Sequence, residues 1–156
     1  MAVRIARVAE ADLPALLPLV RSYCDFYGVA PRDDDLLALS RALIADPEHE
    51  GVQLLACDGD GACVGFATLY WSWDTLVAAR VGLMHDLFVS ERARRRGIGR
   101  ALIDSCREEC AVHGAKKLGW QTAHDNARAR KLYEGIGARR DEWVDYWLPV
   151  DDRREE

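Results

Sequence analysis

The sequence predicts an α/β (α+β) domain in which helices flank a mixed, mainly antiparallel central sheet. Two observations support this fold class. The length of 156 residues suits one ordinary domain, and the apolar patterns indicate the element order β-α-α-β-β-β-α-β-α-β. No repeat, low-complexity tract or linker divides the chain. We therefore expect a single domain over residues 1–150 and a frayed, disordered tail over 151–156.

The first half of the chain is expected to supply three strands and two helices. Apolar and charged residues alternate near the N-terminus, as in a half-buried strand. Helical spacing follows, and Pro18 requires that helix to start late or to kink. Asp33 to Asp35 can cap the second helix, and DGDG between two strand patterns is a hairpin signal. The expected elements are strands over 3–8, 52–57 and 62–71 and helices over 13–27 and 36–45.

The second half is expected to alternate strands with helices. Its most pronounced strand pattern begins at Ala79 and ends at Val89. Further along, apolar side chains recur at every fourth position, as on one face of a helix. The expected elements are strands over 79–89 and 117–122, helices over 97–113 and 126–136, and a last strand region that reaches Leu148.

Composition excludes several classes of protein. With 21 basic and 26 acidic residues and a net charge of −5, the chain is not a general polyanion binder, so we expect no nucleic-acid partner. Five cysteines form no CxxC pair and no zinc-type spacing, and Cys106 and Cys110 suit an apolar helix face; we expect no metal. The sequence shows no signal peptide and no membrane span. Because we find neither a signal peptide nor a membrane span, we expect a cytoplasmic protein without a membrane partner. Its cysteines are then expected to be reduced.

The stretch RARRRGIGRAL, residues 92–102, links the end of a predicted strand to the start of a predicted helix. It does not match the dinucleotide pattern GxGxxG, because Leu102 stands where the third glycine is needed. Gly97 and Gly99 would let an anion approach the backbone, where the first-turn amides and the helix dipole favour negative charge. The stretch therefore predicts an anion cradle, with a solvated basic loop as the alternative.

Two segments, in order and correctly spaced, resemble the GNAT N-acetyltransferase superfamily. LMHDLFVSERARRRGIGRALI, residues 83–103, is similar to the acetyl-CoA-binding segment of that family, and Arg94, Gly97 and Gly99 match its core pattern. LGWQTAHDNARARKLYEGIGAR, residues 118–139, resembles the later strand and helix. The element order fits too, so the resemblance covers nearly the whole chain and implies the GNAT fold.

The resemblance implies how acetyl-CoA would be bound. Backbone groups of Leu87 and Val89, on either side of Phe88, would pair with the pantetheine arm, and the Leu87 N–H would polarise the thioester carbonyl. Asn126 would contact the cofactor, a role compatible with capping its helix. Tyr133 would protonate the leaving thiolate, although its position also suits a packed core tyrosine. The pyrophosphate would be held by backbone amides of residues 95–100, in the loop and the first helical turn. The cofactor-binding residues of this segment would be Arg94, Arg95, Arg96, Gly97, Ile98, Gly99 and Arg100.

His85 and Asp86 are ionisable residues inside an otherwise apolar strand, where polar side chains need a partner or a chemical task. Histidine titrates near neutral pH and suits removal of a proton from an amine, and a carboxylate attracts a cationic substrate. Successive strand residues face opposite sides, so both reach one cleft only if the strand bulges. We predict a catalytic pair in which His85 transfers the proton and Asp86 binds the substrate's charge.

The acceptor pocket is predicted from aromatic residues near acids in SYCDFYG and LYWSWDT. Ring faces attract an alkylammonium group and a carboxylate pairs with it; core aromatics with surface acids are the alternative. The stretch GFATLYWSWDTLVAARVGLMHDLFV also resembles diamine (spermidine/spermine-type) acetyltransferases, in which a glutamate stands at the position of His85. The predicted substrate-binding residues are Asp25, Phe26, Trp71, Trp73, Asp74 and Asp86.

Taken together, the resemblance implies an enzyme that moves the acetyl group of acetyl-CoA directly to a primary amine of a small molecule. The expected acceptors are diamines, polyamines or amino-acid-like compounds, and no metal is needed. The resemblance also implies a homodimer formed through the C-terminal strands. The alternative is a non-catalytic acyl-CoA-binding regulatory module of the same fold.

Overall fold

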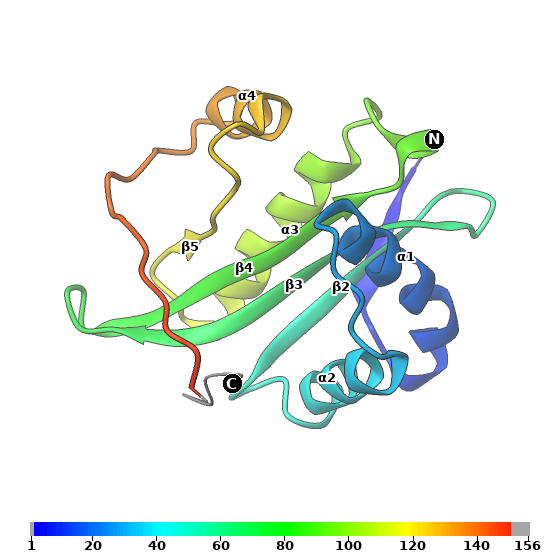
Figure 1. Ribbon diagram of the computed structural model, residues 1–156, viewed down its shortest axis with the longest axis horizontal. Helices are drawn as coiled ribbons and strands as arrows, with labels where there is room; N and C mark the ends of the chain where they lie inside the picture. Colours follow the sequence, from blue (N-terminus) through cyan, green and yellow to red (C-terminus); the bar gives the residue numbers. More distant parts are fainter. Residues whose placement is uncertain (1, 151–156) are drawn as a thin grey trace, which may run out of the picture. The chain divides into compact units, whose positions relative to one another are not determined.

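The central sheet has five strands in the spatial order β1-β2-β3-β4-β5. The first four pair antiparallel, whereas β5 runs parallel to β4. This is the mixed, mainly antiparallel sheet predicted from the sequence, as seen in the computed structural model, which describes residues 2–150 (Figure 1). The strands are β1 (Arg4–Arg7), β2 (Gly51–Cys57), β3 (Cys63–Asp74), β4 (Ala79–Val89) and β5 (Leu118–Gly119).

Four helices accompany the sheet: α1 (Leu13–Phe26), α2 (Asp33–Ala45), α3 (Ile98–His113) and α4 (Ala127–Gly135). The chain forms two compact units, Met1–Ala123 and His124–Glu156, and α4 belongs to the second. In the first unit α1 and α2 cover one face of the sheet and α3 covers the other (Figure 1). Among residues 2–150, no helix is both long enough and apolar enough to cross a membrane.

The first N-terminal helix starts at its expected residue, whereas the second starts three residues earlier than expected. α1 begins at Leu13 and runs through Pro18, where it lacks the hydrogen bond that a proline cannot donate. α2 begins at Asp33, so the three aspartates form its first turn instead of preceding it. Acidic side chains are favourable in the first turn because the helix dipole is positive there.

Each face of the sheet has its own apolar core. Between the sheet and α1 the core contains Leu16, Leu55 and Phe66, among others. On the opposite face α3 buries the side chains of Ile98, Leu102, Ile103, Cys106 and Cys110, which confirms the predicted apolar role of its two cysteines. The absence of a side chain at Gly82 lets α3 lie close to β4, because a Cβ atom there would lie 2.4 Å from the Cys110 Sγ.

Two expected strands are shortened or absent. The strand expected over 117–122 is reduced to β5, and the last strand region expected up to Leu148 is wrong, because residues 138–149 form no strand. An alternating pattern becomes a strand only where a neighbouring strand supplies hydrogen bonds, and the sheet offers none to this segment. Trp143 and Trp147, expected in a core or an interface, are 76% and 85% exposed. The tail expected over 151–156 lies outside the described residues.

A disulfide joins Cys57 at the end of β2 to Cys63 at the start of β3. This corrects the expectation of a fully reduced protein; Cys24, Cys106 and Cys110 are free and buried. Two cysteines six residues apart match no sequence motif. Only the hairpin between β2 and β3 brings their Cα atoms to within 3.9 Å of each other.

Candidate active site

A β-bulge lies in the middle of β4. Thr68 of β3 faces Asp86 and the next residue, Leu69, faces Met84, so His85 has no register partner on β3. Such a bulge bends the strand and re-aims its side chains. The His85 and Tyr70 rings lie edge to face with centroids 5.1 Å apart, and burial, followed by the charge of Asp86, raises the pKa of Tyr70 to about 12. The strand therefore does bulge at this point, which is the condition that the sequence prediction set for His85 and Asp86 to reach one cleft.

The face of the sheet beneath α1 changes from apolar to polar at the level of this bulge. Register partners on β2, β3 and β4 form rows across the sheet. One row consists of Leu55, Phe66 and Phe88, and the row beside it consists of Gln53, Thr68 and Asp86. Gln53 Nε2 donates a hydrogen bond to Thr68 Oγ1 at 3.1 Å, and both side chains are buried. Asp86 is thus the half-buried end of a polar row that borders an apolar core.

Tyr23 of α1 packs over this polar row. Its hydroxyl donates to the His85 carbonyl oxygen at 3.3 Å, and its ring lies edge-on to those of Phe66 and Phe88. Burial, with the charge and hydrogen bond of Asp86, raises the pKa of Tyr23 far above its ordinary value. Sequence reasoning missed both Tyr23 and Tyr70. The signal for Tyr23 was present in SYCDFYG, the stretch used to select its neighbours Asp25 and Phe26.

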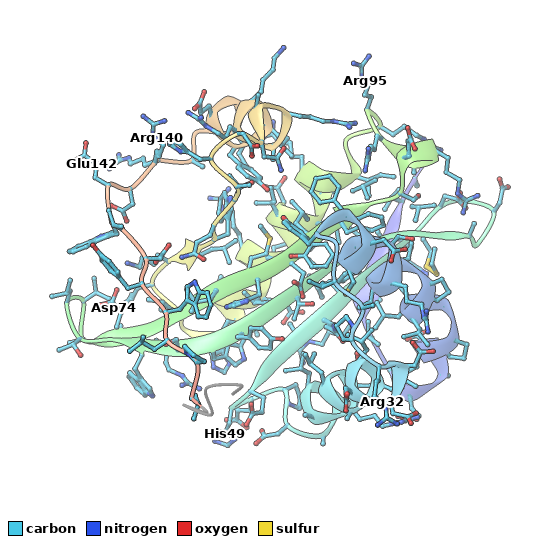
Figure 2. The ribbon with its side chains drawn as sticks, viewed as in Figure 1. Arg32, His49, Asp74, Arg95, Arg140 and Glu142 are labelled. Carbon is cyan, nitrogen blue, oxygen red and sulfur yellow. A yellow bond between two sulfur atoms is a disulfide. The ribbon has the colours of Figure 1, made fainter. Side chains whose placement is uncertain are left out.

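The structure separates most of the predicted acceptor residues from the bulge. Trp71 lies on the α3 face, where its ring stacks on His113 with centroids 3.9 Å apart and its Nε1 donates to the Pro47 carbonyl at 2.9 Å. Trp73 and Asp74 are the last two residues of β3. Asp74 lies at the hairpin end of the strand (Figure 2) and pairs with Lys117 at 2.9 Å.

The predicted residues on α1 lie closer to the bulge. Phe26 is 64% exposed, and its ring contacts Tyr27, which in turn contacts Tyr23; the centroids are 5.1 Å apart at each step. Asp25 is exposed on the same helix. The structure thus links Phe26 to Asp86 through the α1 tyrosines.

The second half of β4 has a free edge. β5 pairs with Gly82 and Leu83 alone, and no other strand of the described chain lies on that side. Backbone groups of an antiparallel strand point alternately to its two edges. The Ser90 N–H donates to the Val64 carbonyl of β3 at 2.8 Å, so the N–H groups of Leu87 and Val89 point to the free edge. This is the orientation needed for the predicted pairing with an extended pantetheine arm.

The loop after β4 has the backbone shape of an anion cradle. Arg95 and Gly97 have φ angles of 62° and 76°, a conformation that can aim successive N–H groups to one side. The following helix, α3, has 16 residues, and its N-cap Gly97 makes no side-chain capping bond. Its first-turn amides therefore suit a pyrophosphate. Ser90 Oγ, just before the loop, is buried and without a hydrogen-bond partner.

The arginines of this loop differ in orientation. Arg94 turns back, and its Nε donates to the Val89 carbonyl at 3.1 Å, which holds the loop against the end of β4. The Arg95 side chain projects away from the loop (Figure 2). Arg100 lies beside Asp104 at 3.6 Å along the exposed side of α3. The backbone, more than the arginine side chains, therefore forms the concave part of the cradle.

The second unit carries the other two predicted residues. Asn126 caps α4, and its Oδ1 accepts a hydrogen bond from the Ala129 N–H at 3.3 Å. Tyr133 lies within α4 and is half-buried; its carbonyl accepts from the Ala138 N–H at 3.0 Å. The capping role predicted for Asn126 is confirmed, and the contacts of both residues with a cofactor stay predictions.

A polar bulge, a free strand edge and an anion cradle on one strand-loop-helix unit are the parts of an acyl-CoA-dependent transferase. The family described as "Acetyltransferase (GNAT) family" matches residues 16–138. The chain belongs to this family, and its fold is the GNAT fold. It is therefore an acetyl-CoA-dependent N-acetyltransferase, as the sequence resemblance implied.

Individual proteins support the same assignment. The uncharacterised N-acetyltransferase YhfO of Bacillus subtilis is 34% identical over 147 residues, covering 94% of this chain and 97% of that protein. The D-amino-acid N-acetyltransferase HPA3 of Saccharomyces cerevisiae is 34% identical over 101 residues, covering 64% and 63% of the two chains. A crystal structure of a probable acetyltransferase has a TM-score of 0.83 at 30% identity and covers 96% of this chain and 99% of that one.

Proposed function

We propose that this enzyme acetylates the primary amine of a small molecule by direct attack of the amine on the thioester of acetyl-CoA. The observation that carries the proposal is the order of groups along β4. His85 and Asp86 form the polar bulge, and Leu87, the next residue, directs its N–H to the free edge. Groups suited to an ammonium and to a thioester carbonyl therefore follow each other on one strand.

The proposed reaction needs four roles. The Asp86 carboxylate attracts the cationic amine, and His85, directly or through a water, takes one proton so that nitrogen can attack the thioester carbon. As the C–N bond forms, the Leu87 N–H stabilises the negative charge on the oxygen. The C–S bond then breaks, and Tyr133 gives its proton to the departing thiolate. The nitrogen loses its second proton as the amide forms, and this proton restores Tyr133 through solvent.

For acetyl-CoA itself, the proposed contacts follow the strand, the loop and the helix start. The pantetheine arm would lie along the free edge at Leu87, Phe88 and Val89, and Asn126 is proposed as a further cofactor contact. The φ angles of Arg95 and Gly97 and the uncapped start of α3 support binding of the pyrophosphate by the amides of 95–100. Arg94 would act by holding the loop against β4.

We propose a diamine, a polyamine or an amino-acid-like compound as the acceptor. A half-buried carboxylate beside the rings of Tyr23, Tyr70 and His85 supports a cationic amine. HPA3, by its name, acts on D-amino acids, which supports the amino-acid-like class. Trp71, Trp73 and Asp74 lie elsewhere on the sheet, so the proposed pocket does not include them.

We also propose that two copies associate through the C-terminal segment. Its apolar side chains Trp143, Tyr146 and Trp147 are 76%, 92% and 85% exposed, and a run of exposed aromatic residues is characteristic of an interface. The cytoplasmic location expected from the sequence stays a prediction.

The function is tested by incubating the protein and acetyl-CoA with a panel of diamines, polyamines, amino acids and aminoglycosides. Release of CoA thiol and the mass of the acetylated amine are measured. We expect turnover with at least one primary amine. Asp86→Asn should lower kcat/KM by about 100-fold through loss of the charge, whereas Asp60→Asn, in the β2–β3 turn, should not. Tight acetyl-CoA binding without CoA release from any amine would instead identify a regulatory module.

A further inference from the structure

We propose that Tyr23 is a positioning residue whose hydroxyl holds the β4 bulge, so that His85 and Asp86 are presented together to the acceptor amine. The proposal rests on the function proposed above and adds a residue that neither the sequence motifs nor the four reaction roles include. It concerns the first unit alone, because α1, β3 and β4 all belong to it.

The bulge has a backbone group that needs a partner from outside the sheet. The register between β3 and β4 shifts at Thr68 and Leu69, which leaves His85 opposite no residue. A bulged residue is left out of the ladder, so its backbone carbonyl needs a partner from a side chain or from water. The Tyr23 hydroxyl donates to the His85 carbonyl oxygen at 3.3 Å from a position 62 residues earlier in the chain. It therefore satisfies the group that the sheet leaves unpaired.

Tyr23 can hold the bulge because its own ring is held. The ring centroid lies 5.8 Å from that of Phe66 and 6.5 Å from that of Phe88, in edge-to-face geometry at both contacts. Phe66 is 1% exposed and belongs to the core beneath α1, against which Tyr23 packs. A phenol anchored in this way reaches from the apolar row of the sheet to the polar row beside it.

The same hydroxyl also lies near the carboxylate of the site. Burial, followed by the charge of Asp86, raises the pKa of Tyr23. The phenol is therefore protonated at neutral pH and remains a donor. The hydroxyl that donates its single proton to the backbone of the bulge thus also lies close enough to Asp86 to be affected by its charge, which couples the surroundings of Asp86 to the shape of the strand.

The test is Tyr23→Phe, which keeps the packed ring and removes only the hydroxyl. Ser22→Ala, which removes an exposed hydroxyl from the neighbouring position on α1, is the matched control. We expect amide hydrogen exchange to accelerate at residues 84–87 and not elsewhere in β3 and β4. In the complex with CoA, we expect an amine substrate to bind about ten-fold more weakly, while acetyl-CoA affinity changes less than about two-fold. The control should match the wild type in each measurement.

A double-mutant cycle with Asp86→Asn completes the test. If the hydroxyl acts by positioning the carboxylate, Tyr23→Phe has little further effect on amine binding once Asp86 is an asparagine. Unchanged exchange and unchanged amine binding in Tyr23→Phe would overturn the proposal, as would faster exchange throughout the sheet, which indicates a purely structural role. If the wild type acetylates no amine, the proposed function fails; if it does and Tyr23→Phe matches it, only this inference fails.

Discussion

Single residues around the Asp86 carboxylate determine what the site can bind. Thr68 faces it from β3, and its charge contributes to the raised pKa values of Tyr23 and Tyr70. None of these neighbours carries a positive charge, so the ammonium group of the proposed acceptor would meet no competing cation from them. Burial strengthens its attraction to the carboxylate, because fewer water molecules screen the charges.

Tyr133 is the residue with the most specific chemical prediction. Tyr133→Phe should lower kcat by at least about 100-fold, because the leaving thiolate then lacks its proton donor. The acetyl-CoA dissociation constant should change less than about two-fold, since the ring remains. Steady-state kinetics and calorimetric titration measure the two quantities. An unaffected kcat would remove Tyr133 from the mechanism and favour its alternative role as a packed core tyrosine.

Among the elements, β4 and the helix that follows it carry most of the site. The sequence predicted β4 over 79–89 as the structure has it, and α3 within one residue, because a long apolar run and a four-residue repeat are strong local signals. The bulge at His85 was not predicted; the sequence indicated only that His85 and Asp86 would need one to reach the same cleft. It arises from the register between two strands, which no local pattern specifies.

Because β4 and α3 lie so close together at Gly82, adding one methyl group there should destabilise the fold. Gly82→Ala should lower the free energy of unfolding by about 1–3 kcal/mol, because its Cβ would lie 2.4 Å from Cys110 Sγ and 3.1 Å from Leu69 Cδ1. Gly119→Ala on β5 is the matched control, since its Cβ would make an ordinary 3.7 Å contact with Leu83. Urea unfolding measures both variants. Equal stabilities would show that α3 does not pack this closely.

At the scale of the whole molecule, the disulfide between Cys57 and Cys63 makes stability depend on redox conditions. Replacing both cysteines with alanine should lower the free energy of unfolding by about 2 kcal/mol, because a short loop of the unfolded chain is no longer closed. Reductant should lower the stability of the wild type by a similar amount and leave the double variant unchanged. Five reactive thiols in the denatured, unreduced wild type, instead of the three free cysteines, would contradict the bond.

The sequence by itself determined the family, the order of the elements up to α4 and the strand-loop-helix segment of the proposed cradle. Each depends on residues close together in the chain, such as Arg94, Gly97 and Gly99, whose spacing limits the backbone shapes available. Tertiary structure alone decided which side chains surround Asp86, that Cys57 meets Cys63, and that Trp71 faces α3. The residues involved are brought together by strand register and helix packing, and neither is encoded in a local pattern.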